Sequence, residues 1–190
     1  MSVSGKVTGS RNNAGGLAAL LSDGSIVDSH ANVELTQSGT EPGNFGVLVG
    51  DVDSGGTITG SSSTGTLTTT SANAGGLVGL LSGSDNGFVH GSSSSVEVNG
   101  QDGSYIGGLI GYLWQNGKVS ESFASGAVSG NSYIGGLIGE SIGGIIEDSH
   151  ATGDVTGSGI QAGGLVGRAF GNTTIINSYA AGDVTGGGNL

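Results

Sequence analysis

The hydrophobic positions of this chain recur in columns, at intervals far longer than a helical turn or a strand alternation. Residues 74–79 read Ala-Gly-Gly-Leu-Val-Gly, and related segments begin at Ile106, Ile134 and Ala162. A weaker copy begins at Ala14 and a degenerate one at Phe45. Self-similarity at a fixed period predicts a repeat architecture. The first column of the repeat consists of Leu17, Leu48, Leu77, Leu109, Leu137 and Leu165.

Two further apolar columns follow in every copy. They are always nine residues apart, whereas the other joins vary in length, so we interpret the nine-residue span as rigid and the other joins as loops. Short β-branched segments between Gly, Ser, Asn and Asp are typical of strands. The second column is Ile26, Ile58, Val89, Val119, Ile146 and Ile175, and the third is Leu35, Leu67, Val98, Val128, Val155 and Val184.

Three short strands in about 30 residues cannot bury a hydrophobic face alone, but stacked units share one continuous core. We therefore predict an all-β fold, a right-handed parallel β-solenoid with three short strands per coil and about six and a half coils. A propeller blade needs about 40 residues or more, so this repeat is too short for one. The whole chain, residues 1–190, is one solenoid domain: a partial coil 1–13 and coils 14–44, 45–73, 74–105, 106–133, 134–161 and 162–190.

A serine column lies three residues after the second apolar column. We expect it to point into the narrow interior, where each hydroxyl bonds along the stack or to a backbone carbonyl. Its role is then structural. The ladder comprises Ser29, Ser61, Ser92, Ser122, Ser149 and Ser178.

The first segment of each copy is apolar or Gly on both strand faces. Two explanations are open: a bulge turns both sets inward, or one set forms an apolar stripe on the outside. We favour the bulge because it needs no partner, although a stripe would permit lateral association.

The repeated Gly-Gly-Leu-Val-Gly and Gly-Gly-Leu-Ile-Gly segments resemble the GLUG motif, as do the phrases at 149–155 (Ser-His-Ala-Thr-Gly-Asp-Val) and 178–184 (Ser-Tyr-Ala-Ala-Gly-Asp-Val). The resemblance covers the whole chain and is most specific in copies three to six. It implies a β-helical repeat of the kind found in secreted or surface adhesin-like proteins of bacteria and archaea. It brings no catalytic residues, and a scaffold does not by itself define a function.

The amino-acid composition excludes several classes of partner and site. Four Lys and Arg against 15 Asp and Glu give a net charge of −11, so we expect no nucleic acid partner. No apolar run is long enough to cross a membrane as a helix, so we expect no membrane insertion. The chain holds no Cys, which excludes disulfides and cysteine-ligated metals.

We expect no enzyme and no cofactor. His30 and His150 share a column but lie four coils apart, and His90 belongs to another column, so the three histidines do not converge. Asp154 and Asp183 stack one coil apart, at a carboxylate spacing that some glycosidases use, yet without basic or aromatic neighbours. Weak Ca²⁺ binding between these two carboxylates is the one metal site we consider.

Two surfaces are candidates for partner contact. Tyr112 and Trp114, in what we interpret as one loop, form an aromatic contact site with Phe170. The second candidate surface is an outward column that includes Thr36, Thr68, Thr156 and Thr185. A flat row of Thr side chains is typical of ice-binding solenoids.

These patterns favour a non-enzymatic, rigid segment of an extracellular or cell-surface protein that acts in adhesion or as a stalk. The expected partners are a surface glycan, a protein ligand, or further copies of the chain. The alternatives are a filament subunit that assembles through open solenoid ends or an apolar stripe, and an ice-binding protein that uses the Thr column.

Overall fold

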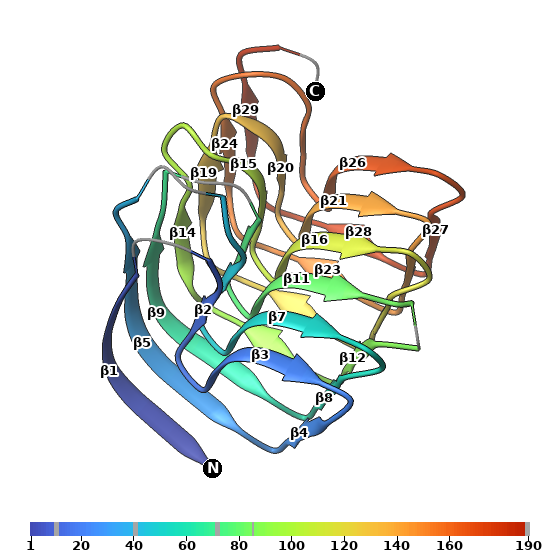
Figure 1. Cartoon of the computed structure of the whole chain (residues 1–190). Helices are drawn as coiled ribbons and strands as arrows, with labels where there is room; N and C mark the ends of the chain where they lie inside the picture. The colour runs from blue at the N-terminus through green and yellow to red at the C-terminus, as the bar shows by residue number, and fades with distance from the viewer. Residues whose placement is uncertain (10–11, 40–41, 71–72, 85, 189–190) are drawn as a thin grey trace.

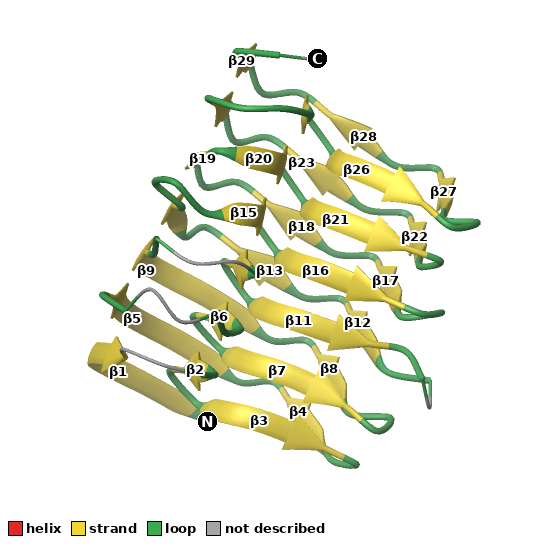
Figure 2. Ribbon diagram, turned by 45° about the horizontal axis from the view of Figure 1, so that its top comes forward, coloured by secondary structure: helices red, strands yellow, loops and turns green. Residues whose placement is uncertain are grey.

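The computed structural model describes residues 1–9, 12–39, 42–70, 73–84 and 86–188. These residues form strands and turns only, wound into a stack of parallel coils (Figures 1 and 2). The prediction of an all-β parallel solenoid is confirmed. Each coil passes through four parallel sheets, named B, C, D and A in the order in which the chain enters them.

The strands of the four sheets have the following bounds. Sheet B contains β2 (Ala14–Gly15), β6 (Phe45–Gly46), β10 (Ala74–Gly75), β15 (Ser104–Gly107), β20 (Ser132–Gly135) and β25 (Ala162–Gly163). Sheet C contains β3 (Ala18–Ser22), β7 (Val49–Asp53), β11 (Val78–Ser82), β16 (Ile110–Trp114), β21 (Ile138–Ile142) and β26 (Val166–Phe170). Sheet D contains β4 (Ser25–Val27), β8 (Thr57–Thr59), β12 (Phe88–His90), β17 (Lys118–Ser120), β22 (Ile145–Glu147) and β27 (Thr174–Ile176). Sheet A contains β1 (Ser2–Gly9), β5 (His30–Gln37), β9 (Ser62–Thr68), β13 (Ser93–Ser94), β14 (Glu97–Asn99), β18 (Phe123–Ala124), β19 (Val128–Gly130), β23 (His150–Ala151), β24 (Val155–Gly157), β28 (Tyr179–Ala180) and β29 (Val184–Gly186).

The three predicted segments are all present, with internal breaks. The first segment of each coil is divided between sheets B and C. The second forms sheet D. The third is a single strand of sheet A in β1, β5 and β9 and a pair of short strands in each later coil. After β1, the described residues supply six strands to each of sheets B, C and D, one per coil. Residues of equivalent columns pair in register from coil to coil.

A bulge divides the first segment at the leucine column. The carbonyl of Leu109 accepts hydrogen bonds from both Leu77 N (2.9 Å) and Val78 N (3.0 Å) of the preceding coil. The carbonyl of Leu137 accepts from Leu109 N and Ile110 N in the same way. Neighbouring coils carry equal numbers of residues across this break, from Gly75 to Val78 and from Gly107 to Ile110. The bulge is therefore a two-residue bend that recurs in every coil, without an inserted residue.

The bulge turns both apolar sets of the first segment into the interior. In the inner coils the residues on either side of the bulge are fully buried: Phe45, Ala74, Ile106 and Ile134 before it, and Val49, Val78, Ile110 and Ile138 after it. Both sets therefore turn inward, as the bulge interpretation predicted, although the turn is a bend without an inserted residue. The external apolar stripe is wrong, because the stripe would need one of these sets to lie outside.

Glycines allow sheets B and C to touch through their backbones at this point. A Cβ on Gly107 would lie 2.0 Å from Ile110 O and 2.8 Å from Gly139 N of the next coil. A Cβ on Gly139 would lie 2.5 Å from Ile106 N. These contacts are with backbone atoms that cannot rotate away, so only glycine fits. The repeated Gly-x-Leu-x-Gly spacing is thus a consequence of two sheets packed without side chains between them.

The three apolar columns line the core. Every member in the four inner coils is at most 1% exposed. In the last coil Leu165 and Val184 are half-buried and Ile175 is 43% exposed, because no described coil covers them. The expectation that Ile175 belongs to a buried core is therefore wrong for this coil. Phe170, Ile176 and Tyr179 are also exposed, because they occupy outward positions of sheets C, D and A.

The serine ladder is continuous and bonds in both of the expected ways. From Ser61 onward, each hydroxyl accepts a hydrogen bond from the backbone N–H of the ladder serine in the preceding coil. Ser92 N donates to Ser122 Oγ over 3.1 Å, and the same bond links every neighbouring pair from Ser29 to Ser178. Each hydroxyl also donates to the carbonyl two residues earlier, as Ser122 Oγ does to Ser120 O over 2.7 Å. The ladder thus satisfies backbone amides at a corner where the strands are interrupted.

Replacement of Gly107 by alanine tests the contact between sheets B and C. We expect Gly107→Ala to lower the free energy of unfolding by about 3 kcal/mol or more, because the methyl group overpacks against fixed backbone. Urea denaturation followed by circular dichroism measures the change. Gly9→Ala is the control, because the nearest atom to its added Cβ lies at 3.6 Å. Equal stability of the two variants would contradict this account of the motif.

Removal of one ladder hydroxyl tests the serine column. We expect Ser122→Ala to cost about 1–3 kcal/mol, since it leaves the buried Ser92 N–H without its acceptor. Ser125→Ala, at an exposed position in the same coil, should change the stability by less than about 0.5 kcal/mol. The comparison uses the urea midpoints of both variants. A Ser122→Ala variant as stable as Ser125→Ala would show that the ladder contributes nothing.

Candidate ligand-binding face

The outer surface of sheet C carries an aromatic cluster. Tyr112 and Trp114 lie in β16 and point outward, whereas Leu113 between them is fully buried. The prediction that these residues form a loop is wrong. The alternation resumes after the bulge, and Leu113 pairs in register with the buried Leu81 of the preceding coil. Strand geometry therefore fixes the two rings on one face.

Two further tyrosines extend this cluster. The rings of Tyr105 and Tyr133, which come from neighbouring coils, stack with centroids 5.1 Å apart. Tyr105 stacks on Tyr112 at 5.6 Å, and Tyr112 contacts Trp114 at 5.6 Å with the planes tilted by 53°. The two pairs that involve Tyr105 are stacked and the Tyr112–Trp114 pair is tilted, and all three separations lie in the range of favourable aromatic contacts. We call Tyr105, Tyr112, Trp114 and Tyr133 the aromatic face.

An ion pair closes one end of the aromatic face. On sheet C, Glu140 of β21 pairs with Tyr112 of the preceding coil and with Arg168 of the next coil. The Arg168 Nε donates to Glu140 Oε1 over 2.6 Å, and a second guanidinium nitrogen contacts the same oxygen. The guanidinium carbon lies 4.1 Å from the Tyr133 ring centroid. The Glu140 side chain is only 2% exposed, so Arg168 neutralises a buried charge.

The hydroxyls of Tyr105 and Tyr112 stay protonated at neutral pH. Burial, together with the charges of Glu140 and Tyr105, raises the pKa of Tyr112 to about 12. Burial and the charge of Glu140 also raise the pKa of Tyr105. Each phenol therefore keeps one O–H donor and an acceptor oxygen at the surface.

The sequence located part of this face. Tyr112 and Trp114 were predicted, and Phe170 lies two coils further along the same column, through Ile142. The Phe170 side chain is 62% exposed and has no ring contact among the described residues. Tyr105 and Tyr133 were missed. Both stand in a Ser-Tyr-Ile-Gly-Gly phrase that recurs after 28 residues, and this repetition was the available signal.

The Thr column lies on the outside of sheet A, in register across the coils. Thr36 and Thr68 are half-buried there, and Thr156 and Thr185 are exposed. Asn99 and Ser129 interrupt the column. The neighbouring outward column carries Glu34, Glu97, Asp154 and Asp183. This surface is mixed in chemistry and does not favour the ice-binding alternative.

The remaining predicted groups lie apart from one another. The Asp154 carboxylate accepts a hydrogen bond from Asp183 N over 2.9 Å, and both side chains are exposed. His150 stacks between Phe123 and Tyr179 on sheet A. His30 Nδ1 lies 2.9 Å from Ser62 Oγ, and His90 Nδ1 lies 3.0 Å from Ser120 Oγ. No group of three or more His, Asp or Glu side chains converges within the described ranges.

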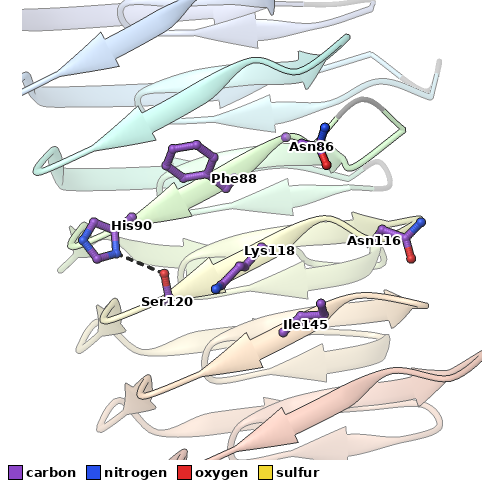
Figure 3. Close-up of a pocket in the computed structure, with 8 residues that line it drawn as sticks. Asn86, Phe88, His90, Asn116, Lys118, Ser120 and Ile145 are labelled. Carbon is purple, nitrogen blue, oxygen red and sulfur yellow. Dashed lines mark hydrogen bonds between the residues drawn. The ribbon is translucent and has the colours of Figure 1, made fainter.

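A groove of about 580 Å³ lies on the outside of sheet D (Figure 3). Its floor consists of Phe88, Lys118 and Ile145, which pair in register on β12, β17 and β22. Asn86 and Asn116, from two turns, stand along one side, and His90 and Ser120 along the other. Sequence reasoning missed this groove because it depends on turns of unequal length.

A stack of parallel coils with matched columns defines the molecule as a β-solenoid repeat protein. The family model described as "The GLUG motif" matches residues 102–129, 130–156 and 158–185. These ranges correspond to the last three coils, each with the Gly-Gly-Leu-Ile-Gly or Gly-Gly-Leu-Val-Gly segment at the contact of sheets B and C. Residues 102–185 therefore consist of three GLUG-motif repeats. No curated protein and no solved structure matches it. The described residues contain no helix that could cross a membrane.

Charge removal tests the ion pair on the aromatic face. We expect Arg168→Met to destabilise the chain by about 3 kcal/mol, because it leaves the buried Glu140 carboxylate without its partner. The double variant Arg168→Met/Glu140→Met should recover most of that loss. Thermal unfolding of the wild type and both variants gives the comparison. A double variant less stable than the single variant would contradict the assigned pairing.

Proposed function

We propose that this chain is a rigid, non-enzymatic segment of a secreted or cell-surface protein, and that it acts in adhesion. The observation that carries the proposal is the aromatic face on the side of a continuous solenoid. Its four rings are fixed by β16 and by two strands of sheet B, so they are presented without any ordering of a loop. Rigid aromatic side chains give contact area at low entropic cost, which is why they dominate many binding surfaces.

The solenoid supports this role as a spacer. Parallel pairing joins the coils on four sheets, and the serine ladder joins them again at a corner. Outward side chains are therefore free to vary while the inward columns maintain the stack. The net charge of −11 suits a surface that must remain soluble in a crowded exterior.

The titratable groups support a binding role over a catalytic one. Glu140, the carboxylate beside the aromatic face, is buried and contacts Arg168, so it is not presented to a substrate. The His90–Ser120 pair resembles a nucleophile and its base. However, His30 and Ser62 repeat the same contact on another surface, as expected of a cross-strand polar pair.

Retention of coated beads tests adhesion. Beads that carry the folded chain should be retained under flow on surfaces coated with polysaccharides or extracellular proteins, whereas beads with heat-unfolded chain should not. The polysaccharide should keep its length during incubation with the chain. Shortened polysaccharide would overturn the non-enzymatic assignment, and equal retention of both kinds of bead would overturn adhesion by the folded chain.

Light scattering of the soluble chain separates adhesion from the filament alternative. The apolar stripe is absent from the described surface, but the last coil exposes Ile175, Ile176 and Tyr179. A constant mass of 18.2 kDa across concentrations fits an adhesive segment. Growth into long species would make assembly the leading function.

A further inference from the structure

We propose that the groove on sheet D binds a neutral sugar ring of a glycan, with the ring stacked on Phe88. This proposal rests on the adhesive function and names its ligand class. The groove has the size of a small-molecule site and presents a mainly apolar floor with a few polar groups on its two sides. Figure 3 shows these residues arranged around one open space.

Phe88 provides the flat apolar surface. It lies on the outside of β12, half-buried, and makes no ring–ring contact with any described aromatic residue. Its neighbours along the floor are the aliphatic stem of Lys118 and, one coil further, Ile145. A pyranose has an apolar face formed by its C–H groups, and this face can cover such a floor while its hydroxyls point to the sides.

The sides of the groove supply fixed hydrogen-bonding groups. Asn86 and Asn116 have positive φ angles of 67° and 56°, so each is held in a left-handed turn at the edge of the groove. On the opposite side the His90 Nδ1 is engaged with Ser120 Oγ, and this contact sets the orientation of the ring. Amide and imidazole groups on both edges match the hydroxyls around a sugar ring, each of which donates and accepts.

Charge argues for a neutral ligand. The Lys118 Nζ lies 2.5 Å from Glu147 Oε1, so the cation that lines the groove is already paired. The whole chain carries −11, which repels an acidic glycan. A proline-rich peptide would also use an aromatic surface, but it needs parallel slots lined by large aromatic rings, and Phe88 is the one Phe, Tyr or Trp among the described residues that line this groove.

Saccharide titration of the intact chain tests the proposal. The probes are the methyl glycosides of glucose, galactose, mannose and N-acetylglucosamine, and short neutral oligosaccharides of each, with glucuronic acid as the acidic comparison. We expect a neutral probe to shift the amide signals of Phe88, Lys118 and Asn116 in ¹H–¹⁵N NMR spectra. Phe88→Ala should weaken that binding at least tenfold. Phe123→Ala, which removes an exposed ring from sheet A, should leave it unchanged.

The other outcomes overturn the proposal in distinguishable ways. Binding of glucuronic acid alone would contradict the neutral ligand. Binding that survives Phe88→Ala and is lost in Trp114→Ala would place the glycan on the aromatic face, so the groove would be wrong and adhesion would stand. No shift with any saccharide, while coated beads are still retained on protein surfaces, would show that the ligand is not a sugar. Lost retention as well would remove the adhesive function itself.

Discussion

The fold depends on the direct contact of two backbones inside each coil. Sheets B and C meet where glycines leave no side chain between them, and the atoms that an added methyl group would strike belong to the main chain. This contact forces the chain to bulge at the leucine column. The bulge in turn brings the apolar residues before and after it to the same side. One steric requirement therefore explains the glycines, the break in the strand and the burial of both flanking sets.

The interior that results is too narrow to admit water, so backbone N–H and C=O groups at the strand breaks need hydrogen-bond partners within the protein. The leucine carbonyls accept two amides each, and the serine hydroxyls accept one amide and donate to one carbonyl. Each such bond contributes only about 1 kcal/mol net, but an unmade one in this interior costs more. Because the bonds recur in every coil, the polar requirements of one coil are met by the next. The stack is consequently stabilised as a unit rather than coil by coil.

The sequence predicted the architecture well because repetition makes inward positions visible as columns. Leu77, Val89 and Val98 could be assigned to the core without any knowledge of neighbouring coils. Ile175 could not, because its exposure depends on which coil covers it. Tyr112 and Trp114 were singled out as surface aromatic residues but placed in a loop, because the bulge interrupts the alternation of inward and outward positions along the strand. The contact of Tyr105 with Tyr112 depends on the close approach of sheets B and C, which no pattern along one segment reveals.

Both proposed binding surfaces lie on the outside of the stack, where side chains do not have to fit the inward columns. The aromatic face and the groove are both in the middle and later coils, on surfaces held by short strands and tight turns. Native-state hydrogen exchange tests the central claim, that the bulge locks these strands together. The amides of Leu109 and Ile110, which share the carbonyl of Leu137, should exchange only through global unfolding, with a free energy equal to that from urea denaturation. Exchange of either amide at the rate of an exposed turn would contradict the account.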